Sequence, residues 1–154
     1  MKYELVGLGH SPKVAILCPR IQPDEIIKHY GDLLSVTYPL MVCDLYQDRT
    51  KKKTSNEAIK EYLADLMPNL VNAGINFLIV TQPDYFKVLS KQAKTDATIG
   101  DIYPSIVDGI SVTYMPNYSR VFYDPEKTTA KIKIGINSVI RWMNGDRAPI
   151  GKSI

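Results

Sequence analysis

The segment richest in groups for binding chemistry is residues 114–123 (YMPNYSRVFY), which places four aromatic rings around one arginine. Aromatic rings interleaved with a cation are typical of sites that stack nucleic-acid bases and hold a phosphate. The alternative interpretation is a loop that folds back over the core on its own tyrosines. The sequence leaves both interpretations open. The candidate binding residues of this segment are Asn117, Tyr118, Ser119, Arg120 and Phe122.

Basic side chains form a second group of candidates. Lys51, Lys52 and Lys53 follow one another in a polar stretch, and Arg49 comes shortly before them. Arg20 follows the first apolar run of the chain. A lysine run is most often a solvated loop, but adjacent cations at a ligand-binding edge can contact phosphates through charge alone.

Three carboxylates could supply acid chemistry. Asp44 directly follows the second apolar run, where ligand groups gather in parallel sheets, although it could equally cap a turn. Asp48 and Asp24 are further candidates for the general acid of a hydrolase or glycosylase. Two cysteines and two histidines, far apart in the sequence, cannot supply a four-cysteine zinc or iron–sulfur site. We therefore expect no metal and no cofactor.

Short apolar runs alternate with segments of helical period along the chain. This alternation predicts an α/β fold, a three-layer αβα arrangement around a mostly parallel four-stranded central sheet. We expect the strands in the order 14–17, 39–43, 77–81 and 110–115, with helices on both faces. Ligands bind such sheets beyond the carboxyl ends of the strands. The loops expected at that edge are residues 18–22, 44–54, 82–85 and 116–124.

The clearest helix begins near residue 54. Thr54 and Glu57 match a capping box, in which each side chain satisfies an end amide of the other residue. Gly74 ends the apolar stripe that follows. Pro68 lies inside the stripe and should kink the helix or split off its last turn.

Three further helices are predicted, and their opening residues are Pro23, Pro83 and Asp124. The last of them has a competing interpretation, because residues 131–136 (KIKIGI) alternate like a strand. The start signal at Asp124 and an apolar stripe that continues to Met143 favour the helix.

The composition fits one ordinary globular domain. The chain has 154 residues, of which 45% are hydrophobic and 23% charged, and its formal net charge is +3. This weak positive excess permits an acidic partner without requiring one. We assign residues 1–144 to a single domain and residues 145–154 to a linker-like tail. The absence of a signal pattern and of a membrane-length apolar window predicts a cytoplasmic protein with no membrane partner.

Taken as a series, three motifs resemble the uracil-DNA glycosylase superfamily, particularly its family 4. Residues 16–20 (ILCPR) stand where the family ends its first strand in a Gly-Glu-Ala-Pro-Gly-type motif. Residues 42–44 (VCD) and 48–50 (DRT) stand where it has Lys-Cys-Arg and then Asn-Arg, and residues 115–117 (MPN) where it has His-Pro-Ser. The similarity covers most of residues 13–143. It implies a glycosylase-like fold whose aromatic–arginine loop enters the duplex beside a flipped base.

Both catalytic positions of that family are replaced in this chain. The acidic position of the first motif falls on Leu17, and the histidine that stabilises the departing uracil anion falls on Met115. An aliphatic and a thioether side chain offer a transition state neither a proton nor a formal charge. The four cluster cysteines of family 4 are also missing.

The resemblance implies a non-catalytic module that binds DNA or a partner protein in bacteriophage DNA replication. Similar glycosylase-like domains without an intact site occur at the N-termini of some bacteriophage DNA polymerases. DNA, replication proteins or a fused polymerase are therefore the expected partners, in the host cytoplasm. Two alternatives stay open: an active glycosylase or hydrolase that uses a relocated acid such as Asp44 or Asp48, and a purely structural protein-interaction domain.

Overall fold

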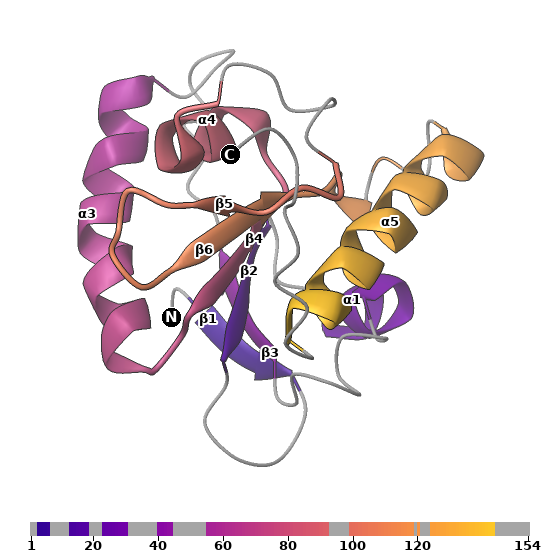
Figure 1. Cartoon of the computed structure of the whole chain (residues 1–154), viewed down its shortest axis with the longest axis horizontal. Coiled ribbons are helices and arrows are strands. Elements are labelled where there is room, and N and C mark those ends of the chain that lie inside the picture. Colours follow the sequence, from indigo (N-terminus) through magenta and orange to yellow (C-terminus); the bar gives the residue numbers. More distant parts are fainter. Residues whose placement is uncertain are drawn as a thin grey trace.

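The computed structural model of the chain describes residues 3–6, 13–18, 23–30, 40–44, 55–92, 99–118, 120 and 124–143. These residues form an α/β fold in which one sheet lies between two layers of helices (Figure 1). The strands are β1 (Tyr3–Val6), β2 (Val14–Cys18), β3 (Leu40–Asp44), β4 (Phe77–Val80), β5 (Tyr103–Pro104) and β6 (Ser111–Tyr114). The helices are α1 (Pro23–Tyr30), α3 (Asn56–Asn72), α4 (Pro83–Ser90) and α5 (Pro125–Met143).

The sheet is parallel at its centre and antiparallel at both edges. Across the described strands the order is β1-β3-β2-β4-β6-β5. The four inner strands pair in parallel, whereas β1 and β5 pair antiparallel with β3 and β6. The predicted α/β class and mostly parallel central sheet are confirmed. The two edge strands are additions that the apolar runs did not predict.

The order of the four parallel strands differs from the expected one. The strand at 14–17 was expected outside the strand at 39–43, but β2 lies between β3 and β4. Val14 is in register with Leu40 on one side and with Phe77 on the other. This position suits the sequence of β2, because residues 14–17 are apolar throughout and all of them are buried. The chain thus runs outward from β2 to β3 and returns past β2 to β4, which creates a topological switch point.

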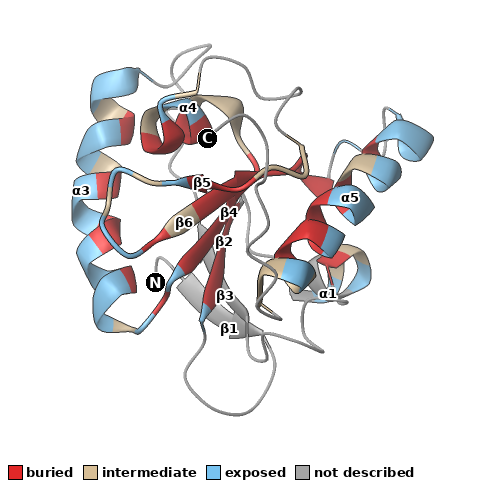
Figure 2. Ribbon diagram, viewed as in Figure 1, coloured by how far each residue is buried: buried red, intermediate tan, exposed pale blue. Residues whose placement is uncertain are grey.

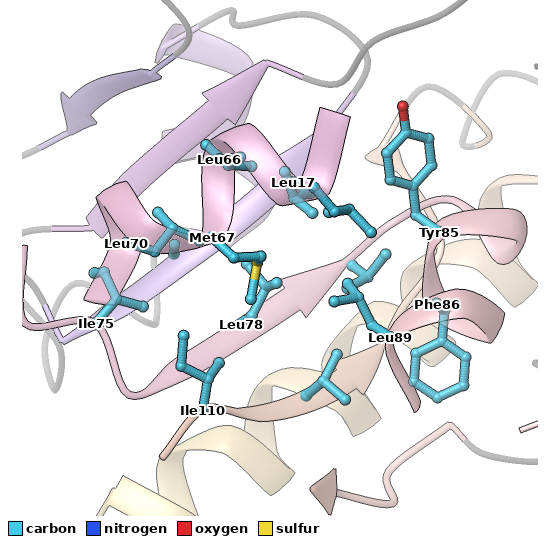
Figure 3. Close-up of a cluster of buried hydrophobic side chains, with 14 of the residues drawn as sticks. Leu17, Leu66, Met67, Leu70, Ile75, Leu78, Tyr85, Phe86, Leu89 and Ile110 are labelled. Carbon is cyan, nitrogen blue, oxygen red and sulfur yellow. The ribbon is translucent and has the colours of Figure 1, made fainter. Parts of the chain in front are cut away.

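Each face of the sheet has its own hydrophobic core. Helices α3 and α4 cover one face, and α1 and α5 cover the other (Figure 1). Side chains from α3, α4 and the strands point toward one another in the first core (Figure 3). Alternate residues of β2 serve the two cores, with Ala15 and Leu17 on the α3 side and Val14 and Ile16 on the α5 side. Figure 2 shows the same division in the helices, which are buried toward the sheet and exposed on their outer sides.

The ends of α3 follow the predicted signals with one shift. The N-cap is Ser55, whose side chain accepts a hydrogen bond from the backbone N–H of Ala58 at 3.2 Å, one residue later than the predicted box. Gly74 follows the helix with a φ of +85°, a conformation that glycine adopts without a Cβ clash. The helix continues through Pro68 to Asn72, so the predicted split does not occur.

Helix α5 is confirmed as a helix, and its glycine sets how closely it approaches the sheet. A Cβ built on Gly135 would lie 2.8 Å from Cε of Met115 and 3.1 Å from its Cβ. Real Cβ atoms do not approach other atoms so closely, so Met115 or the helix would have to shift if residue 135 carried a side chain. The absence of a side chain at position 135 therefore allows α5 to lie against the residue that follows β6.

We expect Gly135→Val to lower the free energy of unfolding by about 1–3 kcal/mol, because the added methyl groups collide with Met115. The loss should shrink in a Met115→Ala background, since the obstructing side chain is then gone. Urea unfolding of the four proteins gives the coupling energy. Asn137→Val, at an exposed position of α5, controls for the helix cost of a β-branched residue. Equal losses of unfolding free energy in Gly135→Val and Asn137→Val would contradict the close approach of α5 to Met115.

Candidate functional site

The carboxyl ends of the parallel strands share one edge of the sheet, and the switch between β2 and β4 lies there. Thr81, directly after β4, joins the two strand ends. Its hydroxyl donates to the carbonyl of Leu17 at 2.6 Å, and its backbone N–H donates to the same carbonyl at 3.2 Å. Thr81 is buried, so the protein's own hydrogen-bonded groups fill the space between the carboxyl ends of β2 and β4. Among the described residues, the polar groups that remain for a ligand lie further out along this edge.

Tyr118 lies in the core and not on the surface. It is 6% exposed, and its ring stacks on that of His29 with a centroid separation of 5.7 Å and an interplanar angle of 9°. The ring of Tyr30 meets it edge-on at 6.3 Å, and the Tyr30 hydroxyl donates to the carbonyl of Pro116 at 3.1 Å. These contacts fasten the segment after β6 to α1. The expected base-stacking role of Tyr118 is therefore corrected to a packing role, as in the alternative interpretation.

Asn117 is also buried, at 4% exposure, so its side chain is not presented to a partner as expected. Its backbone carbonyl accepts a hydrogen bond from the N–H of Arg120 at 3.1 Å, which makes a tight turn. The turn carries the chain from the buried residues 115–118 back to the surface. Arg120, the next described residue, is exposed as expected.

A small polar hollow of about 110 Å³ lies between the end of β6 and the start of α5. Three cationic side chains line it, those of Arg120, Lys127 and Lys131, together with the carboxylate of Asp124. The remaining lining residues are Tyr114, Pro116 and Thr128. Among the described lining residues, three carry a positive charge and one carries a negative charge. An anion the size of a phosphate group fits its charge and its dimensions.

Asp124 contributes to the helix as well as to the hollow. Its Oδ1 accepts from the backbone N–H of Lys127 at 3.3 Å, and its carbonyl accepts from the N–H of Thr128 at 3.0 Å. Its own N–H donates to the carbonyl of Arg120 at 3.1 Å. Asp124 is thus the N-terminal cap of α5, and it fixes the arginine-bearing turn to the helix that carries both lysines.

Lys127 and Lys131 are site residues that the sequence interpretation missed. A signal for them existed, because they stand four residues apart in the first two turns of a predicted helix that follows Arg120. Residues at this spacing lie on one face of a helix.

The two degenerate catalytic positions are both interior. Leu17 is fully buried in the core beneath α3 and α4, where Figure 3 shows it near side chains of both helices. Met115 is fully buried in the other core and packs against Gly135. The two side chains therefore serve opposite faces of the sheet.

The other candidates are placed only in part. Asp24 is exposed in the first turn of α1, and Asp44 is the last residue of β3, with its side chain outside the described part. The remaining candidates lie outside the described residues, and they are Arg20, Asp48, Arg49, Lys51, Lys52, Lys53, Ser119 and Phe122.

Within the described residues, no three His, Cys, Asp or Glu side chains are grouped so that they could hold a metal ion. None of the described helices has the length and hydropathy needed to cross a membrane.

Comparison with known protein families and with curated proteins finds no match to the chain. The resemblance to uracil-DNA glycosylases thus stays a prediction from the quoted motifs, beside an α/β fold that the structure shows.

We expect Tyr118→Ala to lower the free energy of unfolding by about 3 kcal/mol, because it removes a buried ring packed against two others. Tyr118→Phe keeps the ring and should lose less. Thermal and urea unfolding of the three proteins measures both effects. An unchanged melting temperature for Tyr118→Ala would show that the ring is not part of the core.

Proposed function

We propose that the chain is a non-catalytic DNA-binding module that contacts phosphates at the carboxyl edge of its sheet. The observation that carries this proposal is the hollow in which Arg120, Lys127 and Lys131 surround about 110 Å³ of polar space. Arginine and lysine contacts to phosphate supply most of the sequence-independent affinity of DNA-binding proteins. The whole chain carries a formal net charge of only +3, so these three cations form a local concentration of positive charge.

The arrangement of these cations also supports the proposal. Lys127 and Lys131 stand on successive turns of a 19-residue helix, and the positive end of its dipole adds to their charge. Arg120 is held beside them by the capping residue Asp124. These backbone hydrogen bonds place residue 120 beside the start of the helix, so the three cations lie near one another before a phosphate binds.

The non-catalytic part of the proposal is supported by the burial of Leu17 and Met115. An acid or imidazole at either position would be enclosed by apolar side chains on opposite faces of the sheet. The motif series supports a finer assignment, to a glycosylase-like domain acting in bacteriophage DNA replication, as the N-terminal part of a DNA polymerase. We carry that assignment as part of the same proposal.

The protein should release no measurable uracil from uracil-containing DNA. The double variant Leu17→Glu, Met115→His should not gain this activity, because a carboxylate and an imidazole placed in these two cores would be desolvated without supporting partners. A glycosylase assay with a heat-inactivated control measures both. Uracil excision by the unmodified protein, especially if lost in Asp44→Asn, would instead favour the enzyme alternative.

Replacing Arg120, Lys127 and Lys131 together by Gln should weaken duplex binding equally for unrelated sequences. The slope of log affinity against log salt concentration should flatten by up to about 2–3 units, because each lost phosphate contact removes about 0.9. Anisotropy titrations at several salt concentrations measure the slope. Substitution of Lys51, Lys52 and Lys53 tests the predicted lysine contacts in the same way.

The matched control replaces Lys60, Lys87 and Lys91 by Gln, which removes the same charge from exposed positions of α3, of α4 and directly after α4. This control should leave the salt slope unchanged, and all variants are melted before titration. Equal slopes for the two triple variants, or no DNA binding by the unmodified protein, would refute the proposal.

A further inference from the structure

Among its described lining residues, the hollow between the end of β6 and the start of α5 has a buried floor and an exposed rim. Tyr114, Pro116 and Thr128 line it and are all buried, with Tyr114 4% and Thr128 5% exposed. Arg120 and Lys127 also line it but are exposed, so they stand where the hollow meets the surrounding solution. A ligand of this hollow therefore enters end-on, with its leading group toward the floor and the remainder outside.

The hollow is too small for a whole nucleotide. Pockets that enclose a small-molecule ligand measure roughly 300–1,000 Å³, whereas this hollow measures about 110 Å³. The base and the sugar therefore stay outside, and the group that enters is the phosphate alone. Recognition that stops at the phosphate is independent of the base sequence.

The charges around the hollow match a doubly charged phosphate better than a singly charged one. Among the described lining residues, Arg120, Lys127 and Lys131 exceed the carboxylate of Asp124 by two positive charges. A phosphate within a DNA strand is a diester with one negative charge. A phosphate at the end of a strand is a monoester, whose charge at pH 7 is about −1.5 to −2 because its second pKa is about 6. The terminal phosphate therefore balances the charge excess of the hollow, and an internal phosphate balances only half of it.

The number of cations favours the same ligand. A phosphate within a strand has two oxygens that are not bonded to a sugar, whereas a terminal phosphate has three acceptor oxygens. Each of these oxygens accepts a charge-assisted hydrogen bond from a cation. Three cations around one hollow thus provide a donor for each free oxygen of a monoester. The strand continues from a terminal phosphate in one direction only, which suits a hollow that is closed at its floor.

Hydrogen bonds set the width of the opening before a ligand arrives. The carbonyl of Arg120 accepts from the backbone N–H of Asp124 at 3.1 Å and from the hydroxyl of Thr128 at 3.4 Å. Lys127 and Lys131 stand four residues apart on α5, so they lie on one face of the helix to which this turn is bonded. The backbone positions of all three cations are therefore determined by the fold.

We propose that the hollow binds the terminal phosphate of a DNA strand in preference to the phosphates within the strand. This inference rests on the proposed DNA-binding function and narrows it to strand ends. Arg120, Lys127 and Lys131 each meet one free oxygen of the monoester, and the first sugar lies outside the rim. The 5′ and 3′ ends present the same phosphate chemistry, so the experiment includes both.

The test compares short duplexes of one sequence, each labelled with fluorescein on an internal base. Their ends carry a 5′-phosphate, a 3′-phosphate, hydroxyl groups only, or either phosphate blocked as its methyl ester. We expect at least one phosphate-ended duplex to bind about tenfold more tightly than the hydroxyl-ended duplex in anisotropy titrations, which is the gain from about one charge-assisted hydrogen bond. The methyl ester of the preferred phosphate should lose most of this gain, because it lacks one charge and one free oxygen.

Replacing the three cations of the hollow by Gln should abolish the preference for a phosphate end. Lys127→Gln alone, at an exposed position, should already reduce the preference, and it replaces the triple variant if that protein melts early. The matched control, in which Lys60, Lys87 and Lys91 are changed to Gln, should keep the preference.

The outcomes separate this inference from the proposed function. Equal binding of all the duplexes overturns the inference and leaves the DNA-binding function standing, since internal phosphates would then supply the contacts. Absence of binding to every duplex refutes both. The inference is also overturned if the methyl ester binds as tightly as the free phosphate, or if the preference survives in the variants of the hollow.

Discussion

Burial of the two central strands on both of their faces is the constraint on which the rest of this structure depends. Residues 14–17 of β2 and 77–80 of β4 are all fully buried. Their backbone groups are satisfied by parallel neighbours, and their side chains require an apolar layer on each face. Parallel pairing in turn requires crossover connections, which supply α1 on one face and α3 and α4 on the other, and α5, which follows the last strand, completes the cover of the first face.

The same demand for burial determines what is left for function at the carboxyl edge. The residues after β6 continue into the core, where Met115 packs against Gly135 and Tyr118 stacks on His29. The buried hydroxyl of Thr81 donates to the carbonyl of Leu17 and so fills the switch point between β2 and β4. Among the described residues at this edge, charged side chains gather where the chain returns to the surface, at Arg120 and along the start of α5. The packing of these residues therefore places the candidate binding site at the surface, beyond the ends of the strands.

The sequence alone determined the local features of the protein. The apolar runs predicted the four parallel strands, Asp124 and the stripe to Met143 predicted α5, and Gly74 marked the end of α3. Capping, turn chemistry and hydrophobic period act over a few residues, so the sequence displays them directly. Only the tertiary structure decided the place of β2 between β3 and β4, the burial of Tyr118, and the meeting of Arg120 with Lys127 and Lys131 around one hollow. These depend on which distant segments pack together, and a local pattern cannot report that choice because the same apolar strand or aromatic ring can be buried against many different partners.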